Sequence, residues 1–366
     1  MIPKKASQNL YDSMSIRPRK LSRRAVLAHL AAGAGVAAGL GRFGGASAAP
    51  ASMSDLWATY RTRFVEADGR VVDSFNKRIS HSESQGWGML LAAAAGDWAT
   101  FDRIWAWTET QLTWAGAPLF AWSWDPKAGI VSDPNDASDG DILIAWALLR
   151  AGFARQRPDL IDRAKRTIAA IRALLIADVA GEPALLPGFY GFGDKGRTTI
   201  NLSYYVFPAF WDFAHLDGDP IWTAVNDAGV ALARRARFGR YGLAPDWLDI
   251  GDDGALAPAE KWPKRFSYDA IRVPLYLFWA GYDAADDLGV YRNAWRAYQP
   301  PPAWFALDDS ANADIAATVG ATAIAELIDG RRPSDATLWA AVKEGEYYDA
   351  SLALLAALAA KDRSLR

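Results

Sequence analysis

Three segments of the sequence carry the side chains best suited to acid and base chemistry. Each segment places a carboxylate just inside a predicted helix start, among small or aromatic residues. The carboxylates are Glu83 in SHSESQGWGMLLAAAAGD, Asp139 in ASDGDILIAWALLRAG and Asp269 in FSYDAIRVPLYLFW. A pair of carboxyl groups can act as general acid and general base, so the three segments predict a carboxylate-based catalytic site.

Helix capping is the competing interpretation of these segments. Ser80, Ser138 and Ser267 each precede one of the carboxylates and can accept a hydrogen bond from the backbone at a helix start. Ser80 and Glu83 also have the S-x-x-E spacing of a capping box, and the helix dipole favours acidic residues such as Asp141 in a first turn. Taken singly, each carboxylate is therefore explained by capping.

The surroundings of Glu83 favour chemistry over capping. Gln85, Gly86, Trp87 and Gly88 supply hydrogen bonding, close backbone approach and an aromatic surface next to it. A helix cap requires none of these properties. The combination indicates a binding and catalytic site.

Composition narrows the chemistry further. The chain has no cysteine, which excludes disulfides, thiolate metal sites and cysteine nucleophiles. After residue 48 only His81 and His215 remain, far apart in the sequence, so that a zinc enzyme or a histidine-based triad is disfavoured. Acid and base chemistry is left to carboxylates, and we expect no metal and no cofactor.

All 17 tryptophans follow residue 48. The faces of sugar rings are flat and apolar and stack on aromatic planes, so many tryptophans together with carboxylate chemistry indicate a carbohydrate substrate. Large core residues are the alternative, since most tryptophans in proteins are buried. Composition alone leaves both interpretations open.

Residues 1–48 have the pattern of an export signal. A basic start is followed by an apolar stretch over 25–40 and by an A-x-A cleavage pattern at 46–48. Residues 22–27, SRRAVL, resemble the twin-arginine export motif. A retained membrane anchor is the alternative, but the 16-residue apolar run is shorter than the roughly 20 residues of a spanning helix. We expect a periplasmic or secreted protein formed by residues 49–366, with no stable membrane span.

Net charge argues against nucleic acid as a partner. The first 48 residues hold eight Lys or Arg and one Asp, which leaves 32 basic and 41 acidic residues and a formal charge of −9 in the remainder. An acidic protein without a basic run is poorly suited to bind a phosphate backbone.

The sequence after the signal is mainly helical in pattern. Twelve helices are predicted to begin near residues 54, 83, 100, 139, 158, 203, 219, 267, 284, 311, 335 and 349. Residues 160–177 have apolar side chains at helical spacing, and residues 351–360 are nearly all Ala and Leu, which predicts a buried helix. Short strands or long loops are expected over 69–79 and 241–257. Twelve helices without a linker predict one all-α domain.

Motifs within the three segments resemble the signatures of a known family. Residues 82–89 (SESQGWGM) are similar to an acid motif of the form S-E-G-Q-G-Y-G-M, residues 137–141 (ASDGD) to A-S/T-D-G-D, and residues 268–272 (YDAIR) to a base region. Residues 201–204 (NLSY) resemble an N-x-S-Y element. These are the signatures of glycoside hydrolase family eight, and especially of the cellulases encoded with bacterial cellulose synthases.

The resemblance implies a fold and a reaction. The fold is a single α/α toroid of six helical hairpins with a long substrate cleft, and the reaction is inverting, endo-acting hydrolysis of β-1,4-glucan. Glu83 is then the acid, Asp269 the base, and Asp139 the residue that holds the distorted sugar ring and raises the pKa of Glu83. The residues expected to contact substrate are Trp87, Trp122, Trp124, Asn201, Tyr204 and Arg272.

Two departures from the family motif bear on substrate preference. Ser84 replaces the usual glycine and Trp87 the usual tyrosine. Xylan, mixed-linkage glucan and chitosan remain alternative substrates, and a catalytically silent glycan-binding toroid or a polysaccharide lyase are alternatives of another class. The resemblance further implies a functional association with cellulose synthase.

Overall fold

The computed structural model describes residues 51–114, 116–194 and 196–365. The twin-arginine-like motif and the predicted cleavage site lie outside these residues. The described residues belong to one compact unit that begins at Ala51. No helix in this part of the chain is long and apolar enough to cross a membrane.

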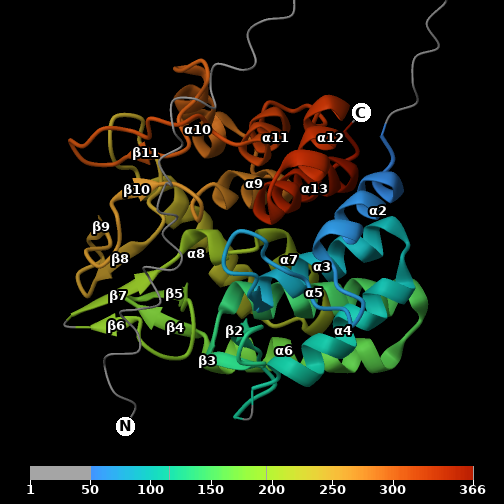
Figure 1. Ribbon diagram of the computed structural model, residues 1–366. Coiled ribbons are helices and arrows are strands. Elements are labelled where there is room, and N and C mark those ends of the chain that lie inside the picture. Colours follow the sequence, from blue (N-terminus) through green and yellow to red (C-terminus); the bar gives the residue numbers. More distant parts are fainter. Residues whose placement is uncertain (1–50, 115, 195, 366) are drawn as a thin grey trace, which may run out of the picture. The chain divides into compact units, whose positions relative to one another are not determined.

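Helices dominate the described residues, as the sequence pattern predicts (Figure 1). The largest differences from the predicted starts are at α9, which begins five residues later at Arg272, and at α11, which begins at Val319 rather than near 311. The helices are α2 (Met53–Phe64), α3 (Ser82–Ala95), α4 (Trp98–Leu112), α5 (Ser138–Arg155), α6 (Pro158–Leu174), α7 (Phe207–Asp217), α8 (Pro220–Arg235), α9 (Arg272–Trp279), α10 (Ala285–Arg296), α11 (Val319–Ile328), α12 (Asp335–Glu344) and α13 (Tyr347–Asp362), with a 3₁₀ turn η1 (Leu202–Tyr204).

Alternate helices form a closed inner ring. Each of α3, α5, α7, α9, α11 and α13 contacts the next one in this order, and α13 returns to α3. The intervening helices α2, α4, α6, α8, α10 and α12 pack against the outside of this ring. This is the predicted α/α toroid of six helical hairpins, and it makes the starts of α3, α5 and α9 neighbours.

Inner and outer helices differ in sequence as their positions require. Along α13 every side chain from Ala350 to Ala360 is buried, in agreement with the Ala and Leu composition of that stretch. The outer helix α6 buries one face, including Leu160, Ile168 and Ile171, and exposes charged side chains on the other. The core therefore lies between the helices of the ring and those around it.

Two glycines allow α3 and α5 to approach closely. A Cβ atom at Gly140 would lie 2.0 Å from the Ser82 hydroxyl oxygen, and one at Gly86 would lie 2.6 Å from the Leu143 Cβ. Only glycine fits at such distances. The close approach brings Glu83, near the start of α3, next to Asp139, near the start of α5.

Short strands are more numerous than the sequence pattern indicated. Most of them have only two to five residues, too few to show a clear alternation of apolar and polar side chains. The strands are β1 (Ser80–His81), β2 (Ala121–Asp125), β3 (Ile130–Asp136), β4 (Ile176–Val179), β5 (Glu182–Leu185), β6 (Gly193–Asp194), β7 (Arg197–Ile200), β8 (Leu248–Gly251), β9 (Leu256–Pro258), β10 (Arg265–Phe266) and β11 (Phe305–Ala306).

These strands form small antiparallel sheets in the loops that connect the helices. The largest has the order β6-β7-β8-β9, and strands β4 to β9 gather on one side of the helical ring in Figure 1. A second sheet pairs β1 with β2 and β2 with β3. Of the two ambiguous segments, 69–79 is a loop, whereas 241–257 contributes β8 and the start of β9.

Candidate active site

A buried arginine lies between the three predicted carboxylates. Arg272 begins α9 and is 3% exposed. Its Nη1 lies 3.1 Å from Glu83 Oε1, and its Nη2 lies 3.1 Å from Asp269 Oδ1 and 3.7 Å from Asp139 Oδ2. Arg272 is therefore a buried cation, and residues 83, 139, 269 and 272 form one cluster.

Glu83 is in the first turn of α3 but does not cap the helix. The N-cap is His81, whose Nδ1 accepts a hydrogen bond from the Ser84 amide, while the Ser84 hydroxyl accepts one from the His81 amide. Ser80 instead belongs to β1, so the predicted Ser80–Glu83 capping box is wrong. Because His81 and Ser84 satisfy the backbone, the Glu83 carboxyl group is free to face Arg272.

Burial raises the pKa of Glu83 well above its usual range. Arg272 opposes this shift, whereas the negative charge of Asp139 and a side-chain hydrogen bond with Asp139 reinforce it. The same interaction lowers the pKa of Asp139, so the pair favours protonation of Glu83 over Asp139. Glu83 is thus held as a neutral carboxylic acid despite its place at a helix N-terminus.

Asp139 is held rigidly at the start of α5. Its Oδ1 accepts a hydrogen bond of 2.8 Å from the Gly140 amide, and the residue is 3% exposed. Ala137 is the N-cap of α5 without a side-chain hydrogen bond, so Ser138 does not have the capping role that the sequence suggested. Burial raises the pKa of Asp139, and Arg272 and the hydrogen bond from Glu83 oppose that shift.

Asp269 lies in a turn before α9 rather than in the helix. Its Oδ2 accepts a hydrogen bond of 3.2 Å from Trp247 Nε1, and its Oδ1 pairs with Arg272. Ser267 does not cap α9, because its hydroxyl and amide both donate to the carboxylate of Asp246. The Ala270 amide also donates to Asp246 at 2.9 Å, so this buried carboxylate fixes the turn that presents Asp269.

Polar side chains behind the cluster orient Arg272. Its Nη2 donates to the Ser203 hydroxyl at 2.7 Å, and that hydroxyl donates to Asn201 Oδ1, also at 2.7 Å. Its Nη1 donates to the Tyr348 hydroxyl at 3.3 Å. Asn201 is 1% exposed, which places it behind Arg272 and not on an open surface.

Tyr204 lines the same cluster. The Arg272 guanidinium carbon is 5.9 Å from the centre of its ring, and the ring meets Trp247 edge to face at 5.9 Å. Burial raises the pKa of Tyr204 well above its usual range, and the charges of Asp139 and Asp269 add to the shift. Its hydroxyl therefore stays protonated in the neighbourhood of all three carboxylates.

Trp87 does not offer the sugar-stacking surface that the sequence suggested. It is 0% exposed, its Nε1 donates to the Tyr276 hydroxyl at 3.2 Å, and its ring stacks on Tyr347. The guanidinium carbon of Arg272 lies 5.9 Å from the centre of the Trp87 ring. Trp87 is a core residue that packs next to Arg272.

Trp122 and Trp124 lie on β2 and are half-buried. Strand β2 pairs with β1, with Trp124 opposite Ser80, so both tryptophans lie beside the start of α3. Trp124 meets Trp107 edge to face at 5.4 Å and Arg70 at 5.2 Å. Both residues remain partly exposed in the sheet that leads into α3.

Four residues around Arg272 and the carboxylates were not proposed as site residues from the sequence. His81, Ser203, Trp247 and Tyr348 come from four separate segments, and the folded ring brings them together. Trp247 lies in the segment whose structure was ambiguous, and Tyr348 is near the end of the chain. A search for polar or aromatic residues next to the matched motifs identifies His81 and Ser203 but not the other two.

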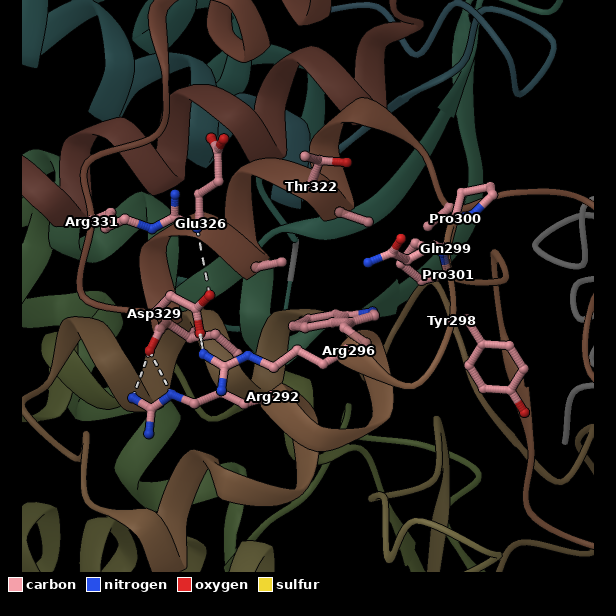
Figure 2. Close-up of a pocket in the computed structure, with 15 residues that line it drawn as sticks. Arg292, Arg296, Tyr298, Gln299, Pro300, Pro301, Thr322, Glu326, Asp329 and Arg331 are labelled. Atoms are coloured by element: carbon pink, nitrogen blue, oxygen red, sulfur yellow. Dashed lines mark hydrogen bonds and ion pairs between the residues drawn. The ribbon is translucent and has the colours of Figure 1, made fainter.

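A separate cavity lies between α10 and α11 and contains none of these residues (Figure 2). Its volume is about 490 Å³, and it is lined by Trp295, Thr322 and Gln299 among others. Asp329 in this lining pairs with Arg296 at 2.6 Å and with Arg331 at 3.5 Å. It offers no carboxylate pair of the kind found around Arg272.

A family model, related sequences and solved structures all match this chain over most of its length. The model of the family described as glycosyl hydrolases family 8 matches residues 38–362. A probable endoglucanase of Novacetimonas hansenii is 39% identical over 338 residues, covering 91% of this chain and 98% of that protein. The structure of the endo-β-1,4-glucanase CMCax from Acetobacter xylinum has a TM-score of 0.81 and 38% identity, covering 87% of this chain and all of that one. An endoglucanase of Komagataeibacter sucrofermentans has a TM-score of 0.80 and 38% identity, covering 86% and 99%.

Proposed function

Since the chain belongs to glycosyl hydrolases family 8, we propose that it is an endo-acting enzyme that hydrolyses β-1,4-glucan with inversion at the anomeric carbon. The observation that supports this most directly is the cluster around Arg272. There a protonated Glu83 and a charge-paired Asp269 contact the two terminal nitrogens of one guanidinium group. The two carboxyl groups thus lie on either side of a common cation.

Glu83 is the general acid in this proposal. Departure of a glycosidic oxygen requires a proton, and a carboxylic acid that is neutral near neutral pH can supply it. Burial and the adjacent charge of Asp139 keep that proton on Glu83. The ordinary helix-start environment would favour the ionised form, so burial is the decisive effect.

Asp269 is the general base. An inverting enzyme activates a water molecule on the face of the sugar opposite to the acid, across a carboxyl separation of roughly 6.5 to 9.5 Å. Hydrogen bonding from Trp247 and pairing with Arg272 orient the Asp269 carboxylate and compensate its negative charge. The protonated hydroxyl of Tyr204 is suited to orient the attacking water.

Asp139 has two roles in this mechanism. Its charge maintains the raised pKa of Glu83, and its carboxylate can accept hydrogen bonds from sugar hydroxyl groups as the ring distorts. Trp122 and Trp124, partly exposed on the strand that pairs with β1, are suited to stack against sugar rings. Arg272 and Asn201 act as positioning residues behind the carboxylates, because both are buried.

Export and a link to cellulose synthesis are part of the proposal. The twin-arginine-like motif supports a periplasmic or secreted location. The motif resemblance to cellulases encoded with cellulose synthases supports a role in trimming newly made glucan chains. Deletion of the gene in its host, followed by measurement of cellulose yield and chain length, tests this role: an unchanged product contradicts it.

Substrate and reaction are tested by assaying reducing-end release from soluble β-1,4-glucan, xylan, mixed-linkage glucan and chitosan. We expect the highest kcat/KM on β-1,4-glucan, with a rapid fall in viscosity because cleavage is internal. A higher value on another polymer assigns that substrate instead. An unsaturated product indicates a lyase, and binding without turnover indicates a silent glycan-binding toroid.

A further inference from the structure

We propose that Trp114, Phe189 and Tyr190 form an aromatic platform that binds a β-glucan chain where it extends beyond the catalytic cluster. The inference rests on the proposed function, since it takes the same polysaccharide as ligand. It adds a binding surface outside the residues identified by the motifs.

The three rings form one contiguous surface group. Phe189 and Tyr190 meet edge to face with ring centres 4.7 Å apart, and Trp114 contacts them at 5.5 and 6.2 Å. Phe189 is 40% exposed and Tyr190 is 53% exposed, whereas Trp114 is half-buried against the core. The platform therefore has an anchored indole at its base and two rings open to solvent.

The exposed rings do not belong to a loosely held loop. The Phe189 amide donates to Asp136 Oδ1 at 2.7 Å, and Tyr190 exchanges two hydrogen bonds of 3.1 Å with the Asn135 side chain. A Cβ at Gly188 would lie 2.6 Å from the Asp136 carbonyl oxygen, so the two backbones are in close contact. The fold thus fixes two apolar rings in an exposed position, where the hydrophobic effect disfavours them.

The platform is attached directly beside the catalytic cluster. The Ser138 amide donates to the Pro187 carbonyl at 2.9 Å, and Ser138 immediately precedes Asp139. Asn135 and Asp136, which hold the two rings, end the strand β3 that leads into α5. A polysaccharide held by Asp139 therefore has the platform within reach along its length.

The chemistry of the surface fits an uncharged glycan. The faces of pyranose rings are apolar and stack on aromatic planes, while the hydroxyl groups at their edges remain hydrated. A second copy of this chain is a poorer fit, because stable interfaces bury well over roughly 1,000 Å² in total and three rings cover only a part of this. The proposal therefore commits to the glucan chain of the active site.

The test compares the variant Phe189→Ala/Tyr190→Ala with the parent enzyme on soluble β-1,4-glucan and on a short cello-oligosaccharide. We expect KM for the polymer to rise about three- to tenfold, as for the loss of aromatic stacking, with kcat nearly unchanged and the short substrate little affected. Trp211→Ala is the matched control, because Trp211 is 58% exposed on α7 and is not part of the platform. A polymer KM equal to that of the parent contradicts the proposal.

Affinity electrophoresis in gels that contain the polymer separates failure of the platform from failure of the proposed function. If the parent enzyme is retarded in the gel but does not cleave glucan, the proposed reaction is wrong. Loss of retardation in the double variant still supports the platform in that case.

The variant Phe189→Tyr/Tyr190→Phe keeps both rings and should behave like the parent. If the double alanine variant does not fold, Tyr190→Ala alone provides the comparison. A change of elution volume in size exclusion with unchanged polymer binding assigns the surface to a second copy and overturns the proposal.

Discussion

At the scale of single residues, one guanidinium group contacts three carboxyl groups whose other neighbours differ. Arg272 contacts Glu83, Asp139 and Asp269, yet burial and the neighbouring Asp139 raise the pKa of Glu83 well above its usual range. Asp269 has a separate partner in Trp247. The roles of acid and base therefore follow from the neighbours of each carboxylate and not from its type.

The variants Glu83→Gln and Asp269→Asn test these roles. Each replaces a reacting carboxyl group with an amide of similar shape, so kcat should fall by about two to four orders of magnitude while glucan binding remains measurable. Reducing-end assays and affinity electrophoresis give the two quantities. Substantial activity in either variant refutes the assignment of that residue.

Asp139→Asn tests the origin of the raised pKa of Glu83. Loss of the negative charge, and its replacement by an amide that donates to the Glu83 carboxylate, both lower the pKa of Glu83. Since the acid must be protonated, activity is lost as pH rises through that pKa. The alkaline limb of kcat/KM against pH should therefore move to lower pH in the variant. An unmoved limb, or one displaced to higher pH, contradicts the proposed coupling.

The sequence was sufficient to bring forward the three carboxylates and Arg272, but not the geometry of the cluster or all of its neighbours. The motifs marked Glu83, Asp139, Asp269 and Arg272 because their neighbours had distinctive types. The motifs led us to expect that Trp87 contacts substrate, but it is buried. A buried tryptophan and a sugar-stacking one look alike in sequence. Trp247 and Tyr348 were missed because only tertiary structure brings them to the cluster.

At the scale of elements, the contact between α3 and α5 sets the separation of Glu83 and Asp139. This contact depends on Gly140, where an added Cβ would also lie 2.9 Å from the Glu83 amide. Sequence analysis recognised the glycines as part of a motif, but their role in bringing two helix starts together required the ring. Likewise, capping by His81 and Ser84 was not foreseen, because Ser80 offered the more familiar spacing.

Gly140→Ala tests the importance of this approach. The methyl group must displace α3 from α5, which should destabilise the protein by about 1 to 3 kcal/mol and reduce kcat more than the loss of stability explains. Chemical unfolding and kinetics measured at a temperature where the variant is folded distinguish the two effects. Gly289→Ala, in α10 with open space around it, is the control and should be neutral or slightly stabilising. Full activity in Gly140→Ala contradicts the proposed role of the contact.

The turn before α9 depends on Asp246, and the stability of the protein should reflect its ionisation. Burial raises the pKa of Asp246 to about 6, and the charge of Asp269 adds to the shift. Because the pKa of Asp246 is higher in the folded state than in the unfolded state, protonation of Asp246 stabilises the folded protein. This stabilisation is complete below about pH 4 and is lost as pH rises to about 6. The side chain of Asp246→Asn cannot ionise, so the variant should not show this decrease in unfolding free energy, which amounts to at most about 3 kcal/mol.

Urea unfolding at several pH values measures this effect as the difference in unfolding free energy between the parent and Asp246→Asn. The difference should change between about pH 4 and pH 6 and stay constant above that range. Asp97→Asn is a control of opposite sign, because burial of Asp97 is outweighed by hydrogen bonds from Trp57 and Thr100, which hold its pKa at about 2. If the difference between the parent and Asp246→Asn does not vary with pH, Asp246 does not titrate as described.

At the scale of the whole unit, the closed ring of six inner helices explains why residues nearly 200 positions apart form one site. The starts of α3, α5 and α9 meet because each inner helix contacts the next and α13 returns to α3. Helix number and order were predictable from hydrophobic periodicity, since long buried helices such as α13 have a strong signal. The short strands and loops that position Trp122, Trp247 and the aromatic platform were not predictable. Each of these segments has too few residues to show a clear hydrophobic periodicity.

The stereochemistry of hydrolysis tests the central claim most directly. NMR of the anomeric protons, recorded in the first minutes of cleavage of a soluble β-1,4-glucan oligosaccharide, identifies the first product before mutarotation. If Glu83 is the acid and Asp269 activates water on the opposite face, the new reducing end must appear first as the α-anomer. Initial formation of the β-anomer would mean a retaining reaction and would contradict the assignment of Asp269 as the base.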